Sequence, residues 1–330
     1  MSSLGIIDRV LHRVPGEAIS WIGPCPWTGG VAYGTESGKL FVGEDAWPFS
    51  SEAINGVAFS GDWGCVTTGE DVAIFDRDRR RVEKHQFGAH GVTPLKTGGF
   101  LAPLGPSGLM FAQIDSQGEP EVRIQRFESE RFNGYQACSL GVVHGVEYFA
   151  CAARRDGIVV EMVPPQDPHR PPTVHGSGQF DIVDVCSLGL PLAAVALAID
   201  GTLFFGRDLV AEPADMLSVT AFRGRAYSLR RIGDHLVILG SENLLIFPGL
   251  VANYLAGRRG QKHRYLTMHV QASEIFAIGD DLYTLEGDDA VPNSMRSLLD
   301  QHPEEGSAVE FLDHQLSRVS LPPSAFSVAS

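Results

Sequence analysis

Acidic residues recur in short turns along this sequence, at positions where they could bind a basic partner or a cation. These acidic turn residues are Glu36, Glu70, Asp71, Asp156, Asp200, Glu242, Asp280 and Asp281. If the turns share one face of the fold, they form an acidic surface that attracts positive charge. The alternative is structural, because aspartate and glutamate suit solvated turns in any protein. The net charge of −14 favours this structural interpretation.

Basic residues form two runs against this acidic background. The first run consists of Arg77, Arg79, Arg80, Arg81, Lys84 and His85, and the second of Arg258, Arg259, Lys262, His263 and Arg264. Such runs can dock an acidic partner or nucleic-acid phosphates. They can also protect a strand edge or simply line a solvated loop. No aromatic residue interleaves with the first run, so stacking on bases is not indicated there.

Motifs that would identify an enzyme are missing from the sequence. It contains no G-x-S-x-G, no H-E-x-x-H and no phosphate-binding loop, and its five cysteines form no C-x-x-C pair. His90, His144 and His175 each precede a glycine, which suits a metal or acid-base cluster or, more simply, hydrogen-bonded turns. The structural interpretation is favoured, and we predict no catalytic, cofactor-binding or metal-binding residue.

All four tryptophans lie in the first 63 residues, within a region rich in proline and aromatic side chains. Tryptophan dominates many binding surfaces, but it also fills protein cores. Proline and glycine surround Trp27 and Trp47, so these two are expected to be the exposed members. They are added to the predicted partner-binding residues.

A repeat sets the positions of these side chains. A short apolar run, a tight turn and a second short apolar run recur seven times, with turn markers at Gly38, Gly69, Gly108, Gly157, Gly201, Ser241 and Gly279. The markers are spaced 31 to 49 residues apart. The flanks favour β-branched, aromatic and large aliphatic residues, and turns such as Asp200-Gly201 tolerate positive φ. Each copy therefore predicts a β-hairpin.

Further strands complete each unit. A third strand precedes most hairpins, most clearly at Cys138–Gly141 and Cys186–Gly189, and a polar fourth strand follows, as at Val82–Phe87 and Val122–Phe127. Four strands per unit and seven units of about 40 residues predict an all-β, seven-bladed β-propeller of four-stranded antiparallel blades.

The chain resembles the WD40-like β-propellers over roughly residues 17 to 290. Ile74-Phe75-Asp76 stands where that family ends a third strand with an apolar pair and Trp-Asp. His90-Gly91 and His175-Gly176 stand near the place of its Gly-His element, whereas the other copies end in FVG, VEM, FFG, IFP and TLE. The resemblance implies a propeller with degenerate repeats.

The predicted organisation is one propeller domain over residues 1–330. Its blades are placed at about 17–50, 53–90, 91–130, 134–176, 180–214, 217–250 and 266–290, and residues 1–16 and 291–330 are assigned to ring closure and a tail. Either Ile6–Val14 or Ala308–Leu321 is expected to supply a closing strand. Short helices are expected at Pro292–Gln301, with Ser294 as N-cap, and at Leu250–Ala256. Pro164–Pro172 is expected to be an exposed loop.

Location and partners follow from composition. The longest apolar stretch, Leu188–Ile199, is too short to span a bilayer, and charges interrupt the first residues, so no membrane and no signal peptide are expected. The cysteine usage fits a reducing compartment, so we predict a cytoplasmic protein. The arginine, glycine and alanine usage suggests a bacterial one. The favoured function is a non-enzymatic scaffold or recognition subunit that binds one or more proteins of a complex.

The residues expected to contact that partner are Glu36, Asp71, Asp156, Asp200, Glu242, Asp280, Arg258, Arg259, Lys262, Arg264, Trp27 and Trp47. Two alternatives stay open. One is a propeller hydrolase, lactonase-like or sugar-active, with a central metal near Asp181, Asp184 or His269. The other is a propeller that contacts nucleic acid through its basic runs.

Overall fold

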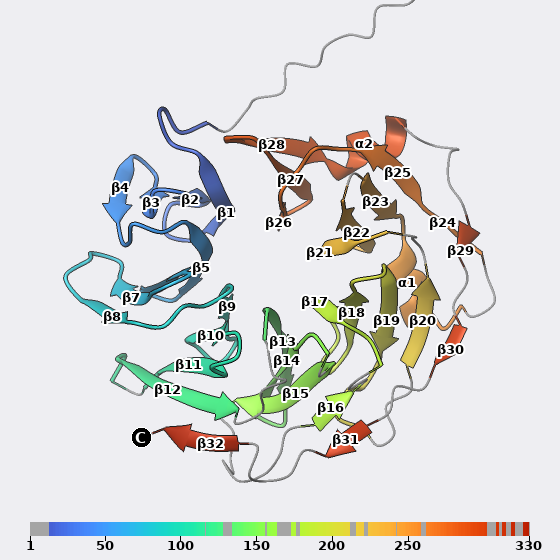
Figure 1. Ribbon diagram of the computed structural model, residues 1–330, viewed down its shortest axis with the longest axis horizontal. Helices are drawn as coiled ribbons and strands as arrows, with labels where there is room; N and C mark the ends of the chain where they lie inside the picture. Colours follow the sequence, from blue (N-terminus) through green and yellow to red (C-terminus); the bar gives the residue numbers. More distant parts are fainter. Residues whose placement is uncertain are drawn as a thin grey trace, which may run out of the picture.

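Short antiparallel strands dominate the computed structural model, which describes residues 13–115, 117–127, 134–155, 157–163, 173–175, 179–211, 216–220, 224–241, 243–258, 262–301, 308–309, 312–314, 318–320 and 326–329. The strands form seven radial sheets around a central channel (Figure 1), which confirms the predicted seven-bladed propeller. In each blade the first strand is innermost and the following strands step outward in chain order.

The first four blades follow one another closely in the sequence. Blade 1 contains β1 (Ile19–Cys25), β2 (Gly30–Thr35), β3 (Lys39–Val42) and β4 (Asp45–Pro48); blade 2 contains β5 (Ile54–Ser60), β6 (Trp63–Thr68), β7 (Val72–Asp76) and β8 (Val82–His85). Blade 3 contains β9 (Thr93–Pro94), β10 (Phe100–Pro103), β11 (Leu109–Ile114) and β12 (Pro120–Phe127); blade 4 contains β13 (Gln136–Val143), β14 (Val146–Ala152), β15 (Ile158–Val163) and β16 (Thr173–His175).

The last three blades are less regular. Blade 5 contains β17 (Ile182–Ser187), β18 (Ala194–Ala198), β19 (Thr202–Gly206) and β20 (Met216–Thr220); blade 6 contains β21 (Ala226–Ile232), β22 (His235–Gly240), β23 (Asn243–Phe247) and β25 (Leu266–His269). Blade 7 has three strands within the described chain, β26 (Ile275–Ile278), β27 (Asp281–Glu286) and β28 (Asp289–Ser294).

Two blade boundaries differ from the sequence prediction. The outer strand of blade 5 ends at Thr220, beyond the predicted end at 214. Helix α1 (Leu250–Leu255) and β24 (His263–Arg264) interrupt blade 6, so its fourth strand is β25, which the prediction assigned to blade 7. Both predicted helices are present: α1 matches Leu250–Ala256, and α2 (Met295–Gln301) begins directly after Ser294. Pro164–Pro172 lies outside the described residues.

The core consists of apolar clusters between blades. One cluster lies between each pair of neighbouring blades, and the cluster that joins blade 7 to blade 1 contains Val14, Ile19, Ile22, Tyr283, Leu285 and Ala290. Strands buried on both faces explain why the sequence runs are apolar rather than alternating. The ring also closes through polar contacts, since Arg13 pairs with Asp289 and the Ile19 amide donates to the Asp288 carbonyl.

None of the described C-terminal strands joins blade 7, so Ala308–Leu321, one of the two closing strands expected, is not seen to close the ring. Instead β29 (Ala308–Val309) pairs with β24, and β30 (Leu312–His314), β31 (Arg318–Ser320) and β32 (Phe326–Ala329) pair with the outer strands of blades 5, 4 and 3 (Figure 1). For the other candidate, Ile6–Val14, only its last residues are described, and Val14 packs between blades 7 and 1.

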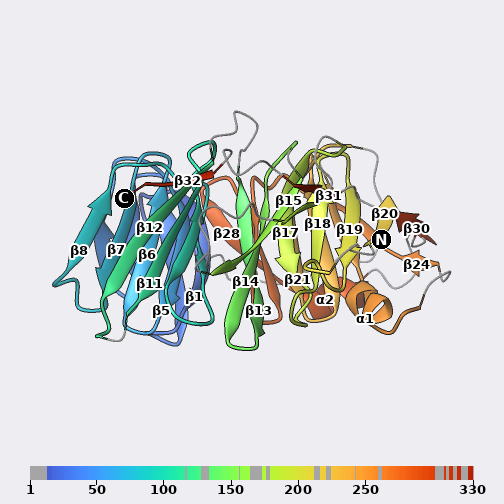
Figure 2. The same ribbon diagram turned by 90° about the horizontal axis from the view of Figure 1, so that it is seen from below.

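The meander of each blade gives the disc two different faces. We call upper the face that carries the turns between second and third strands and the connections between blades. The lower face carries the turns between first and second strands, and both helices lie on it (Figure 2). Glycine serves the tight upper turns: Gly38 and Gly201 have φ of 74° and 85°, which a residue with a Cβ rarely adopts.

Candidate functional site: the upper mouth of the channel

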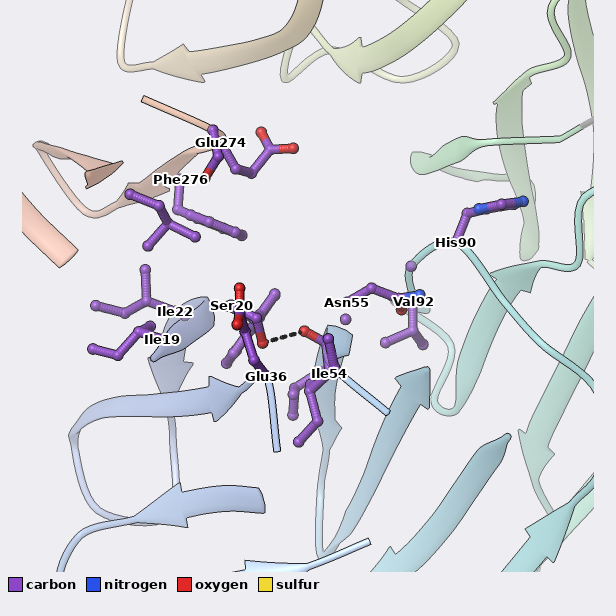
Figure 3. A pocket seen from close by; sticks show the side chains of 18 of the residues that line it. Ile19, Ser20, Ile22, Glu36, Ile54, Asn55, His90, Val92, Glu274 and Phe276 are labelled. Atoms are coloured by element: carbon purple, nitrogen blue, oxygen red, sulfur yellow. Dashed lines mark hydrogen bonds between the residues drawn. The ribbon is translucent and has the colours of Figure 1, made fainter. Parts of the chain in front are cut away.

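The central channel contains two cavities lined mainly by innermost strands. The upper one, of about 480 Å³, opens between blades 7, 1 and 2 (Figure 3). The second, of about 490 Å³, is lined by β13, β17 and β21, and both cavities share Gln136, Arg230 and Ala277. These sizes are typical of sites that receive a small molecule or a few inserted side chains.

A β-bulge recurs near the start of the innermost strand in four blades. It places Ser20, Asn55, Val183 and Tyr227 out of register with the second strands of blades 1, 2, 5 and 6. A bulge bends the strand and redirects a side chain, and bulges are frequent beside functional sites. Tyr227 is 47% exposed, with the Arg225 guanidinium 5.7 Å from its ring centre.

Two of the bulged residues form side-chain hydrogen bonds at the mouth. The Ser20 hydroxyl donates to the Ile54 carbonyl at 2.7 Å (Figure 3), and Asn55 Nδ2 donates to the Ala89 carbonyl at 2.5 Å. The Thr67 hydroxyl donates in turn to Asn55 Oδ1 at 2.7 Å. The Ser20 bond therefore joins blade 1 to blade 2, and the Asn55 bond fixes the connection that leads from blade 2 to blade 3, which stiffens the mouth.

Replacing Asn55 by alanine is expected to lower the free energy of unfolding by about 1–2 kcal/mol. The substitution removes the bond to the Ala89 carbonyl and the bond from the Thr67 hydroxyl. Chemical denaturation measures the change. Gln86→Ala, at an exposed position near the outer edge of the same blade, is the matched control and is expected to change stability by less than about 0.5 kcal/mol. Equal effects of the two substitutions would contradict this role of Asn55.

Acidic side chains lie on the upper face of the three blades between which the upper cavity opens. We call the acidic sector the set on the upper face of blades 1, 2 and 7: Glu36, Glu52, Glu70, Asp71, Glu274 and Asp288. Glu36 and Glu274 also line the cavity (Figure 3). Within the described chain only Glu274 of this set forms an ion pair, with Arg230 at 3.4 Å. The sector thus presents unneutralised negative charge at the opening.

An ion-paired triad forms the opposite wall of the channel. Arg230 on β21 pairs with Asp184 on β17 at 2.8 Å and with Glu274 before β26, so one guanidinium connects blades 5, 6 and 7. Asp184 also accepts the Leu229 amide at 2.7 Å. Burial raises the pKa of Asp184 despite the nearby guanidinium. Burial opposes the charged form of Arg230, yet Asp184 and Glu274 together raise its pKa.

The residues predicted for a central metal are not brought together. Asp184 lines the channel, but Asp181 precedes β17 at the upper face, and His269 lies exposed on β25, the outer strand of blade 6. The expectation that His269 lies near an inner strand is therefore wrong. Among the residues that the structure describes, no three His, Cys, Asp or Glu side chains are grouped to hold a metal ion.

The three histidines that precede glycines also lie apart. His90 is on the upper face, stacked on Tyr135 with ring centres 4.5 Å apart, and burial together with Arg154 lowers its pKa. His144 is in the lower turn between β13 and β14. His175 is fully buried on β16, with Nε2 2.7 Å from the Leu209 carbonyl. The three histidines therefore form no common cluster within the described chain, and His175 lies on a strand rather than in a turn.

The predicted acidic turns divide between the faces. Glu36, Asp71 and Asp200 lie in upper turns, whereas Asp280 lies in the turn between β26 and β27 on the lower face. The equivalent upper turn of blade 7 is formed by Gly287 and Asp288, which the prediction missed because Gly279-Asp280 has the same local chemistry. Asp156, Glu242 and Arg259 lie outside the described residues.

The tryptophan prediction fails for Trp47. Its side chain is only 8% exposed and packs edge-on against Phe75 at 5.8 Å, under the guanidinium of Arg79. Trp27 is half-buried, and its indole N–H donates to the Gly61 carbonyl at 2.8 Å on the lower face. These two rings hold blades 1 and 2 together rather than forming an exposed patch.

The first basic run is engaged within the molecule. Arg80 pairs with Asp78, Arg81 with Glu119 and His85 with Glu83, while Arg77 and Lys84 donate to the carbonyls of Trp27 and Phe49. The ion pairs offset the charges of Arg80 and Arg81, whereas Arg77, Arg79 and Lys84 keep their positive charge. In the second run Arg258 donates to Asn253 Oδ1, and Lys262 and Arg264 are exposed beside β24.

Comparison with known proteins places the fold and no more. No family model matches the chain, and no curated protein matches it. The crystal structure of the Myceliophteria thermophila Cps50 (Swd1) β-propeller domain aligns with a TM-score of 0.62 and 11% identity, over 87% of this chain and 100% of that one. The computationally designed Ika8 protein aligns with a TM-score of 0.55 and 13% identity, over 79% of each chain. The fold is thus that of WD40-like propellers.

No helix in the described part has the length and apolarity to cross a membrane.

Proposed function

We propose that this protein is a non-enzymatic recognition subunit that binds a basic segment of a protein partner at the upper mouth of its channel. The observation that carries the proposal is the acidic sector, of which Glu36 and Glu274 line a preformed cavity. Among the described residues, the only ion-pair partner of this sector is Arg230, which pairs with Glu274. The likeness to a WD40-like propeller domain supports an interaction role. We further propose that residues 1–330 form one domain, and that the protein works in the cytoplasm of a bacterium within a multi-protein complex.

The mechanism is preorganisation together with electrostatic attraction. The bulged strands and the Ser20 and Asn55 bonds hold the rim before a partner arrives, so little conformational entropy is lost on binding. The acidic sector raises the local concentration of a basic segment and speeds its encounter, an effect that salt weakens. Lysine or arginine side chains of the partner would enter the cavity beside Glu36 and Glu274.

The test compares two triple variants that change net charge equally. Glu36→Gln/Asp71→Asn/Asp288→Asn neutralises the acidic sector, and Asp62→Asn/Asp234→Asn/Asp280→Asn neutralises three exposed aspartates in lower turns. Fluorescence anisotropy with a lysine- and arginine-rich probe peptide, and with partners captured from native lysate, reports affinity for both. The upper variant is expected to bind about 10–100-fold more weakly, because each lost charge contributes roughly 0.5–1 kcal/mol.

Two outcomes would overturn the proposal. Equal losses in both variants would mean that only net charge matters. Undiminished binding by the upper variant would place the contact elsewhere on the disc. The nucleic-acid alternative is less favoured because Arg80 and Arg81 of the first basic run pair with carboxylates and the net charge is −14. It predicts instead that charge reversal at Arg258 and Arg264 abolishes binding to a DNA or RNA probe.

A further inference from the structure

The outer edges of three blades are covered by the end of the chain itself. Strand β30 extends blade 5, β31 extends blade 4 and β32 extends blade 3, each as a fifth antiparallel strand (Figure 1). We call β30, β31 and β32 the C-terminal strap. Its registers are short: Leu312–His314 pairs with Met216–Ser218, Arg318–Ser320 with Thr173–His175, and Phe326–Ala329 with Ile124–Phe127.

The strap follows a regular path. It passes from blade 5 to blade 4 to blade 3, opposite to the order in which the chain builds the blades. Successive strap strands begin six and eight residues apart, and six extended residues span about 20 Å. In each interval the chain passes from the outer edge of one blade to that of the next, as the three registers show. Within the described chain the outer strands β4, β8, β25 and β28 of the other four blades pair with no strand of the strap, so strap pairing is specific to three edges.

The pairing uses the backbone ladder, which any copy of the strap can form equally well. Opening the strap in one chain breaks three short ladders and leaves the edges of β12, β16 and β20 unpaired. Unpaired edges accept another strand readily. If a second chain supplies its own strap, every broken pair is formed again, and the main remaining cost is that of association.

We propose that the outer edges of blades 3, 4 and 5 are a strand-docking surface for the strap of a second copy of this chain, which yields a strand-exchanged dimer. A second copy is the fitting occupant because its strap carries the register and the strand spacing that these edges already accept. Within one chain the strap has a high effective concentration, so the exchanged dimer grows with protein concentration and forms fastest after partial unfolding.

The test uses full-length chains with paired cysteines. One chain carries Thr173→Cys and the other Ser320→Cys, positions that face each other in the register of β16 and β31. Opposed residues in antiparallel strands have Cα atoms about 4.5–5.5 Å apart, within the range of a disulfide. The two chains are mixed at rising concentration, partially unfolded in denaturant, refolded and oxidised. The mismatched control pairs Thr173→Cys with Ser327→Cys, which faces Arg126 on blade 3.

The expected result is a mixed disulfide dimer that increases with concentration and exceeds the mismatched control at least tenfold. Light scattering of the unmodified chain should show a dimer over the same range. A mixed product no more abundant than the mismatched control overturns the proposal. So does an unmodified chain that stays monomeric throughout. Neither readout involves the acidic sector, so this test is independent of the proposed function.

Discussion

Replacing Arg230 by methionine is expected to lower the free energy of unfolding by about 3–5 kcal/mol, the largest effect of any single substitution considered. The guanidinium lies between Asp184 and Glu274 and compensates a carboxylate that is only 3% exposed. Removing one member of a buried pair leaves the other charge without compensation in a medium of low polarity. Chemical denaturation at neutral pH measures the loss.

The same variant should show a distinctive pH dependence. Burial raises the pKa of Asp184, and the guanidinium opposes this rise, so its removal lets the pKa rise further. A carboxyl with a raised folded-state pKa holds a proton in the fold that the unfolded chain has lost. Protonated Asp184 therefore imposes no charge penalty on the fold below the ordinary pKa range of aspartate. As pH rises through the folded-state pKa, Asp184 ionises and this favourable contribution to the free energy of unfolding is lost. The stability difference between wild type and Arg230→Met should therefore grow from acid towards neutral pH.

The control is the double variant Asp184→Asn/Arg230→Met, which removes both charges. The double variant should recover much of the free energy of unfolding that Arg230→Met loses. The difference in this free energy between the double variant and wild type should vary far less with pH. A single variant that is as stable as wild type at neutral pH, or a deficit that shrinks as pH rises, would contradict the account of the triad.

Replacing Glu147 by alanine is expected to cost about 3–4 kcal/mol. Glu147 on β14 is fully buried and accepts the backbone amides of Lys96 and Thr97 at 2.8 Å, together with the hydroxyls of Thr97 and Ser139. One carboxylate thus connects blade 4 to the turn between β9 and β10 of blade 3. Its removal leaves donors without an acceptor, and hydrogen bonds to charged groups contribute about 1.5–3 kcal/mol each without being additive.

Two readouts test this role. Thermal or chemical unfolding gives the overall loss, and amide hydrogen exchange at Lys96 and Thr97 reports whether the turn itself is released. The matched control is Glu121→Ala, because Glu121 is exposed and pairs only with Arg123, which predicts a change below about 0.5 kcal/mol. Unchanged exchange at both amides would show that Glu147 does not hold the turn.

The fold could be predicted because its determinants are local and repeated. Turn pairs such as Asp200-Gly201 between apolar runs predict a hairpin wherever they occur, and seven spaced hairpins leave few architectures. The blade boundaries near α1 could not be predicted in this way. An insertion separates β25 from its blade, and the ladder that assigns it to blade 6 joins Leu266–His269 to Asn243–Ile246 across the helix.

The candidate site was predicted only in part. Glu36 and Asp71 lie on the upper face because their turns join the second and third strands of their blades, and their role in binding a partner stays a prediction. Arg230 and Glu274 carry no local signal, since their contacts join residues 44 or more positions apart. Trp47 was misjudged because proline neighbours indicate a strand end, whereas its burial depends on Phe75 in the next blade.

The reverse path of the strap has a mechanical consequence. A force applied to the C-terminus against a fixed N-terminus would act on the ladders one after another. The ladder of β32 is nearest the C-terminus along the chain and opens first, followed by those of β31 and β30. Ladders of three or four residue pairs that open in sequence would yield at low force, before any blade is stretched. Single-molecule pulling would then record small early steps, followed by the larger rupture of the ring at the contact between blade 7 and blade 1.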